Sequence, residues 1–119
     1  MKPRFVTALT VAAVLLSAEA RAARLVTAPI FLGTGQAGLA HIANVGTKPI
    51  TDVRIVCRNI AGSSVTNASS PMMQPGASFN PGLPTGGGSV YCEFSAEQGA
   101  RSIRASVENT VTGAVSEAR

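Results

Sequence analysis

Two cysteines, Cys57 and Cys92, are the residues of this chain whose type and spacing best support a defined chemistry. A redox-active pair usually has two residues between its cysteines, whereas 34 residues separate these two. A structural zinc site needs about four ligands, and the chain offers only one histidine besides its two cysteines. We therefore predict that Cys57 and Cys92 form one structural disulfide, as is typical of chains in oxidising compartments.

The chain has few residues that could act in acid–base or nucleophilic catalysis. His41 is the only histidine and Asp52 the only aspartate, and the sequence has no Gly-x-Ser-x-Gly motif. A hydrolase would need a nucleophile beside the histidine and a carboxylate to orient it. Four glutamates are spaced like solvent-facing residues of strands and turns: Glu93, Glu97, Glu108 and Glu117. We predict that the protein is not an enzyme.

Two further motifs resemble ligand sites only superficially. Met72 and Met73 could join His41 as soft ligands for copper, but two methionines in a proline-rich loop need no such role. Residues 33–38, GTGQAG, are similar to a phosphate-binding loop, yet they lead into a predicted strand. They therefore lack the helix N-terminus that binds phosphate. We expect no metal and no cofactor.

The N-terminus has the composition of a secretory signal peptide. Lys2 and Arg4 precede the apolar run 5–16, and small residues offer cleavage after Ala20 or Ala22. A helix of 12 residues rises about 18 Å, whereas the hydrocarbon core of a bilayer is about 30 Å thick. The run is therefore predicted to be a cleaved signal rather than a stable membrane anchor.

Residues 1–20 are thus predicted to be the signal peptide, and residues 21–119 to form one small domain that is periplasmic or secreted. Loss of Lys2, Arg4 and Glu19 would lower the formal net charge from +4 to +3. The remaining basic residues are scattered, and no dense basic stripe with interleaved aromatic residues is present. We expect no nucleic-acid partner.

The elements that would position these residues are strands. In 51–60, Val53, Ile55 and Cys57 alternate with Arg54 and Arg58, as expected for a strand with one buried face. Helical periodicity is absent after the signal, and turn-forming residues recur throughout. The predicted strands are 24–32, 36–44, 51–60, 63–66, 77–79, 89–96 and 101–107, with a weaker tail over 109–119.

Three connections have recognisable turn chemistry. Residues 44–47 predict a turn with Asn44 or Gly46 at positive φ. Residues 97–99 fit a tight hairpin between the last two strands. Residues 71–88 hold four prolines and a run of three glycines, which predicts a long surface loop.

About seven short strands in a chain of this length predict an all-β, antiparallel two-sheet sandwich behind the signal helix. Residues 42–57, IANVGTKPITDVRIVC, resemble the strand–turn–strand unit of bacterial immunoglobulin-like accessory domains, including the CARDB-like type. Residues 74–79, QPGASF, are similar to their Pro-Gly turn. The resemblance implies an immunoglobulin-like fold and an accessory or adhesive role, and it carries no catalytic residues. Asn80 and the prolines that follow it depart from the pattern.

The order of strands places Cys57 and Cys92 on neighbouring strands of one sheet, unlike the inter-sheet bridge of antibody domains. Two roles remain open at this point. The first is a non-enzymatic exported module that binds a protein or glycan at the cell envelope. The second is a subunit of a pilus-like surface assembly that is joined by strand addition, with residues 24–32 as the donated strand.

Overall fold

The computed structural model describes residues 23–97 and 100–119. The predicted signal peptide, with its cleavage sites, lies outside these residues. The described elements are β1 (Ala23–Val26), β2 (Ile30–Leu32), β3 (Gly38–Asn44), β4 (Ile50–Asn59), β5 (Ser64–Met73), β6 (Ser78–Phe79), β7 (Gly82–Leu83), β8 (Gly88–Ala96), a short 3-10 turn η1 (Ala100–Ser102), β9 (Ile103–Asn109) and β10 (Val115–Glu117). No helix among them is long and apolar enough to span a membrane.

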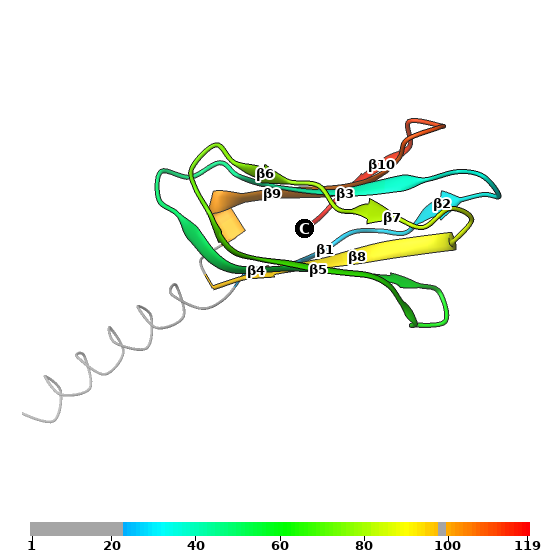
Figure 1. Cartoon of the computed structure of the whole chain (residues 1–119), viewed down its shortest axis with the longest axis horizontal. Helices are drawn as coiled ribbons and strands as arrows, with labels where there is room; N and C mark the ends of the chain where they lie inside the picture. Colours follow the sequence, from blue (N-terminus) through cyan, green and yellow to red (C-terminus); the bar gives the residue numbers. More distant parts are fainter. Residues whose placement is uncertain (1–22, 98–99) are drawn as a thin grey trace, which may run out of the picture.

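The strands form two antiparallel sheets that pack face to face as a sandwich (Figure 1). Sheet 1 has the order β1–β8–β4–β5, and β2 also pairs with β8. Sheet 2 has the order β10–β9–β3–β6, and β7 also pairs with β3. The all-β two-sheet architecture predicted from the sequence is therefore present.

The core lies between the sheets and is built by the alternation seen in the sequence. In β4 the side chains of Val53, Ile55 and Cys57 are buried, while Arg54 and Arg58 face outward. Phe94 on β8 is the largest fully buried side chain. The inward residues of sheet 2 that face it across the sandwich are aliphatic: Ala40, Ile42, Ile103, Ala105 and Val107.

The number and extent of the strands differ from the prediction, since the described residues form ten strands rather than about seven. The expected strand 24–32 is two strands, because Thr27–Pro29 interrupts it, and both pieces pair with β8. Strand β5 has ten residues, whereas the sequence predicted a short strand ending at Thr66. The polar composition of β5, together with Pro71, is untypical of a strand, and the full length of β5 was therefore not predicted. The predicted loop 71–88 consequently contains the end of β5 as well as β6 and β7.

The hairpin predicted at residues 97–99 is wrong. Strand β8 pairs with β1, β2 and β4, while β9 pairs with β3 and β10, so the connection crosses from one sheet to the other. Turn residues report local backbone freedom, and they do not determine which sheet the next strand joins.

The turn after β3 is present, but its predicted mechanism is wrong. Neither Asn44 nor Gly46 has a positive φ. Instead, Oδ1 of Asn44 accepts a hydrogen bond of 3.0 Å from the amide of Gly46, and this side-chain contact shapes the turn. Close packing also favours glycine here, because a Cβ on Gly46 would lie 2.9 Å from Oγ of Ser102.

Cys57 and Cys92 form a disulfide between the neighbouring central strands β4 and β8. The two residues are directly opposite in the register and both are fully buried. The position within one sheet agrees with the order of strands inferred from the sequence. The bridge crosslinks the middle of sheet 1 rather than joining the two sheets.

Candidate functional site

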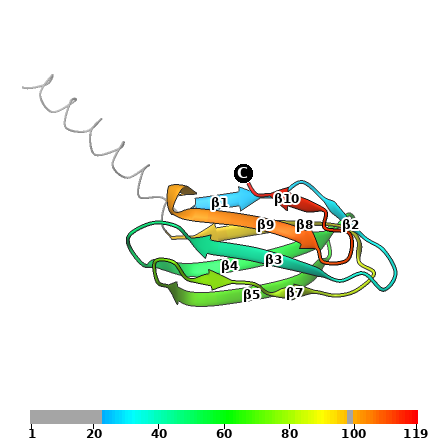
Figure 2. The ribbon, with the colours of Figure 1, turned by 90° about the horizontal axis from the view of Figure 1, so that it is seen from above.

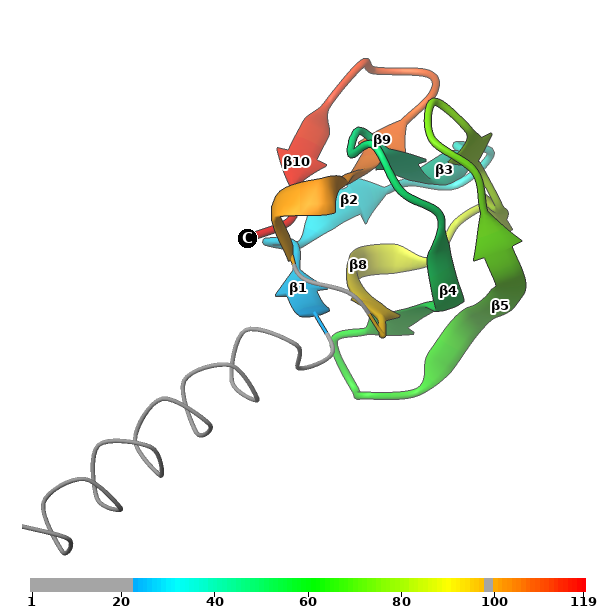
Figure 3. The same cartoon turned by 90° about the vertical axis from the view of Figure 1, so that its left-hand side faces the viewer.

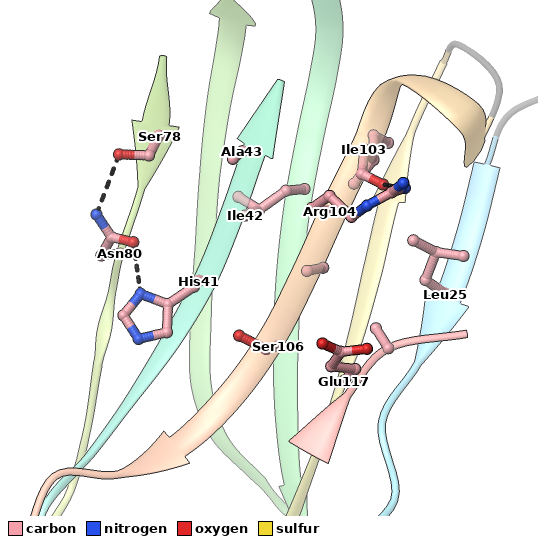
Figure 4. Close-up of a pocket in the computed structure, with 12 residues that line it drawn as sticks. Leu25, His41, Ile42, Ala43, Ser78, Asn80, Ile103, Arg104, Ser106 and Glu117 are labelled. Carbon is pink, nitrogen blue, oxygen red and sulfur yellow. Dashed lines mark hydrogen bonds between the residues drawn. The ribbon is translucent and has the colours of Figure 1, made fainter. Parts of the chain in front are cut away.

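The outer face of sheet 2 carries a shallow open hollow of about 440 Å³ (Figure 4). Its polar side chains come from four segments that are far apart in sequence. They are His41 on β3, Ser78 and Asn80 from β6 and the residues after it, Arg104 and Ser106 on β9, and Glu117 on β10.

Strand register explains why these residues meet. His41 lies opposite Ser106, and Ser106 lies opposite Glu117, so three neighbouring strands place one polar row across the sheet. Residues paired across a sheet share a face, and the buried neighbours Ala40 and Ile42 fix that face of β3 as the outer one. The floor of the hollow is thus the β3–β9 pair.

The imidazole of His41 is held at both ring nitrogens. Its Nδ1 lies 2.7 Å from Oδ1 of Asn80, and its Nε2 lies 2.8 Å from Oε1 of Glu108. Asn80 also donates from Nδ2 to Oγ of Ser78, at 3.4 Å. These contacts orient the ring at one margin of the hollow, and Figure 4 shows those that run from His41 through Asn80 to Ser78.

The arrangement does not form a nucleophile–base pair. Ser106 is the hydroxyl beside His41, but both ring nitrogens already face oxygens of Asn80 and Glu108. The ring could accept a proton from Ser106 only by breaking one of these contacts. What the hollow offers is a set of oriented donors and acceptors.

The three residues considered as copper ligands do not lie together. Met72 and Met73 are adjacent on β5 and therefore point to opposite sides, with Met73 buried and Met72 half exposed. His41 lies on the outer face of the other sheet. Within residues 23–97 and 100–119, no group of three or more His, Cys, Asp or Glu side chains could hold a metal ion.

The outer face of sheet 1 has a different character. Arg24, Arg54 and Arg58 share this face through their pairing with β8, and Glu93 stands between them. The carboxylate of Glu93 lies 3.3 Å from the guanidinium of Arg24 and 3.9 Å from that of Arg58. These basic residues are scattered in the sequence and come together only through strand pairing.

His41 shares its outward side with Leu39 and Ala43, as the alternation along β3 indicates. The sequence analysis did not identify Glu108 or Asn80 as partners of His41. Their separations of 67 and 39 residues along the chain mean that only the pairing of β3 with β9 and β6 could reveal them. The alternation of β9 alone does place Glu108 on an outer face.

The comparisons with known proteins identify no relative. No protein-family model, no curated protein and no solved structure gives a significant match. The fold and the hollow therefore carry the functional argument alone.

Proposed function

We propose that this protein is a small exported, non-enzymatic β-sandwich that binds a polar partner, a protein or glycan of the cell envelope, through the hollow on sheet 2. The observation that carries the proposal is the fixed orientation of His41 between Asn80 and Glu108. Partner-binding sites need polar groups that are already oriented, because ordering them on binding costs free energy.

Export to the periplasm or beyond is part of this proposal. The buried disulfide supports it, since structural disulfides form and persist mainly in oxidising compartments. The predicted signal peptide supports the same destination.

We further propose that the domain is an accessory module related to immunoglobulin-like sandwiches, as the resemblance of residues 42–57 suggests. One feature departs from the antibody pattern. In antibody-type domains the disulfide joins the two sheets. Here the disulfide lies within sheet 1, between the neighbouring strands β4 and β8.

The alternative is a subunit of a pilus-like assembly that donates residues 24–32. In the structure these residues form β1 and β2, and both pair with β8 of the same chain. Donation would require both strands to leave the sheet and would expose buried side chains such as Ile30 and Leu32. We therefore favour the binding module.

The test is saturable binding of the labelled, disulfide-bonded chain to envelopes isolated from the cells that produce it. Ser106→Trp fills the hollow with a bulky side chain, and we expect it to weaken binding about tenfold, or about 1.4 kcal/mol. Thr85→Trp, in the exposed loop between β7 and β8, is the matched control and should bind like the wild type. Equal binding by both variants would exclude the hollow as the binding site.

A further inference from the structure

Most of the sheet edges in the described part of the chain are protected against pairing with another strand. On one side of the sandwich, Val26 of β1 and Arg119 exchange two backbone hydrogen bonds of 3.1 Å, which join the two sheets. On the other side of sheet 2, β6 and β7 have two residues each and are separated by Asn80 and Pro81. Short, interrupted or covered edges are common protection against unwanted pairing.

Strand β5 is the exception. It has ten residues, it ends the order of sheet 1, and its only partner among the described strands is β4 (Figure 3). It contains no charged residue. A long, uncharged edge of this kind presents unpaired backbone groups to any strand that can approach it.

The register shows which backbone groups face the open edge. The Cα atoms of Cys57 and Cys92 are 4.0 Å apart, as in a non-hydrogen-bonded pair, so the amide and carbonyl of Cys57 point toward β5. Thr66, opposite Cys57, therefore hydrogen-bonds to β4. By alternation, the backbone groups of Asn67 and Ser69 point away from β4 toward the open edge.

Two features limit this edge, and they are symmetric about Ala68. The register with β4 shifts between Cys57 and Arg58, which leaves Val65 as an extra residue in β5. Pro71 has no amide hydrogen to donate. Val65 and Pro71 each lie three residues from Ala68, so an antiparallel copy of β5 centred on Ala68 would place one interruption opposite the other.

From this symmetry we propose that the free edge of β5 pairs with β5 of a second copy of this chain, antiparallel, about a twofold axis at Ala68. Asn67 then lies opposite Ser69 of the partner copy, and each such pair exchanges two backbone hydrogen bonds. Ala68 faces its own counterpart, where the small side chain permits the close approach of a non-hydrogen-bonded pair. The result is one continuous sheet across both copies (Figure 2 shows β5 at the margin of the sandwich).

Charge and shape both agree with a second copy as the occupant. The nearest arginine to the edge, Arg54 on β4, would be separated from its counterpart by three strand spacings across the sheet, which is at least roughly 14 Å. This exceeds the Debye length of about 8 Å at physiological salt, so their repulsion is largely screened.

On the inner side, Thr66 donates to the carbonyl of Gly82 at 3.3 Å, which draws β5 toward β7. The edge therefore offers a backbone ladder rather than a deep groove for the large side chains of a foreign strand.

The test is sedimentation velocity of the disulfide-bonded chain at concentrations up to about 1 mM, the weak end of specific association. We expect a concentration-dependent dimer. Asn67→Lys with Ser69→Lys places like charges opposite each other and should weaken the dimer by about tenfold or more. Asn67→Lys with Ser69→Glu places lysine opposite glutamate of the partner copy and should restore it. Thr85→Lys, away from the edge, should leave it unchanged.

The rescue distinguishes this register from other associations. A monomer at all concentrations would overturn the proposal, and so would a lysine–glutamate variant that is as impaired as the double-lysine variant. Circular dichroism checks that each variant keeps its β structure. The outcome is independent of envelope binding, because β5 belongs to sheet 1 and the hollow lies on sheet 2.

Discussion

Asn44 and Asn109 occupy equivalent positions at opposite ends of the paired strands β3 and β9. Each is the last residue of its strand, and both are almost fully buried. Nδ2 of Asn44 donates to the carbonyls of Lys48 and Met73, at 2.8 and 2.9 Å. Nδ2 of Asn109 donates to the carbonyl of Phe31 and to Oε1 of Gln36, at 2.9 and 3.0 Å.

In each case the side-chain oxygen also accepts hydrogen bonds from the turn that follows. Gly46 donates to Asn44, while Val111 and Thr112 donate to Asn109. The side-chain amide of each asparagine thus supplies hydrogen-bond partners to several groups that the loop backbone leaves without one. The two ends of the sandwich are closed by the same device.

Replacing either asparagine with aspartate should destabilise the fold. A carboxylate keeps the shape but cannot donate, so the buried carbonyls lose their partners and the free energy of unfolding should fall by about 1–3 kcal/mol. Urea denaturation of Asn44→Asp and Asn109→Asp measures the loss. Gln74→Glu, the same chemical change at an exposed position, should stay within about 0.5 kcal/mol of the wild type. Equal effects at all three sites would contradict the assigned role.

Removal of the disulfide should have a larger effect. The bridge closes a loop with a sequence separation of 35, for which the chain-entropy model gives about 3.5–4 kcal/mol. Replacement of Cys57 and Cys92 by alanine together avoids leaving one unpaired thiol. Thiol counting on the denatured, unreduced wild type should find no free cysteine. Two free thiols would show that the bond does not form in the protein.

Asp52 is the one non-glycine residue of the described chain with a positive φ, at 56°. This conformation costs a β-branched residue roughly 1–2 kcal/mol, whereas glycine adopts it freely. Asp52→Val should therefore lower the free energy of unfolding by about that amount, while Asp52→Gly should be neutral or slightly stabilising. Thermal unfolding of the two variants in parallel gives the comparison. A valine variant as stable as the glycine variant would contradict the backbone geometry.

Two adjacent residues of β3 point to opposite sides of sheet 2. His41 faces the hollow and Ile42 faces the core. His41→Ala should change the free energy of unfolding by less than about 1 kcal/mol, because its contact with Glu108 is partly exposed to solvent. Ile42→Ala removes a fully buried side chain and should cost about 2–5 kcal/mol. A large loss for His41→Ala would assign the contacts of this histidine to folding rather than to binding.

Period-two alternation predicted the buried face of β4 correctly, because a half-buried strand needs only its own sequence to reveal its faces. Most of strand β5 was not predicted, since its inward positions Thr66, Ala68 and Ser70 are small or polar rather than apolar. Its pairing with β4 stabilises it, and such pairing is not visible in a local pattern.

The candidate site was less predictable than the fold. Alternation along β3 shows which residues share a side with His41, but its contact with Glu108 depends on β3 lying beside β9 in antiparallel register. The sequence instead suggested that β8 and β9 form a hairpin. Long-range register is set by the packing of the whole sandwich, so the partners of a surface residue emerge only with the three-dimensional structure.

The sulfur bond between Cys57 and Cys92 also has a mechanical consequence. If the domain were stretched from its two ends, tension would pass through the bridge and bypass the intervening segment, which includes β5, β6 and β7. A separation of 35 residues corresponds to roughly 120 Å of extended chain that could not be drawn out. The segment that carries the free edge would thus remain a closed loop under load for as long as the sulfurs stay joined.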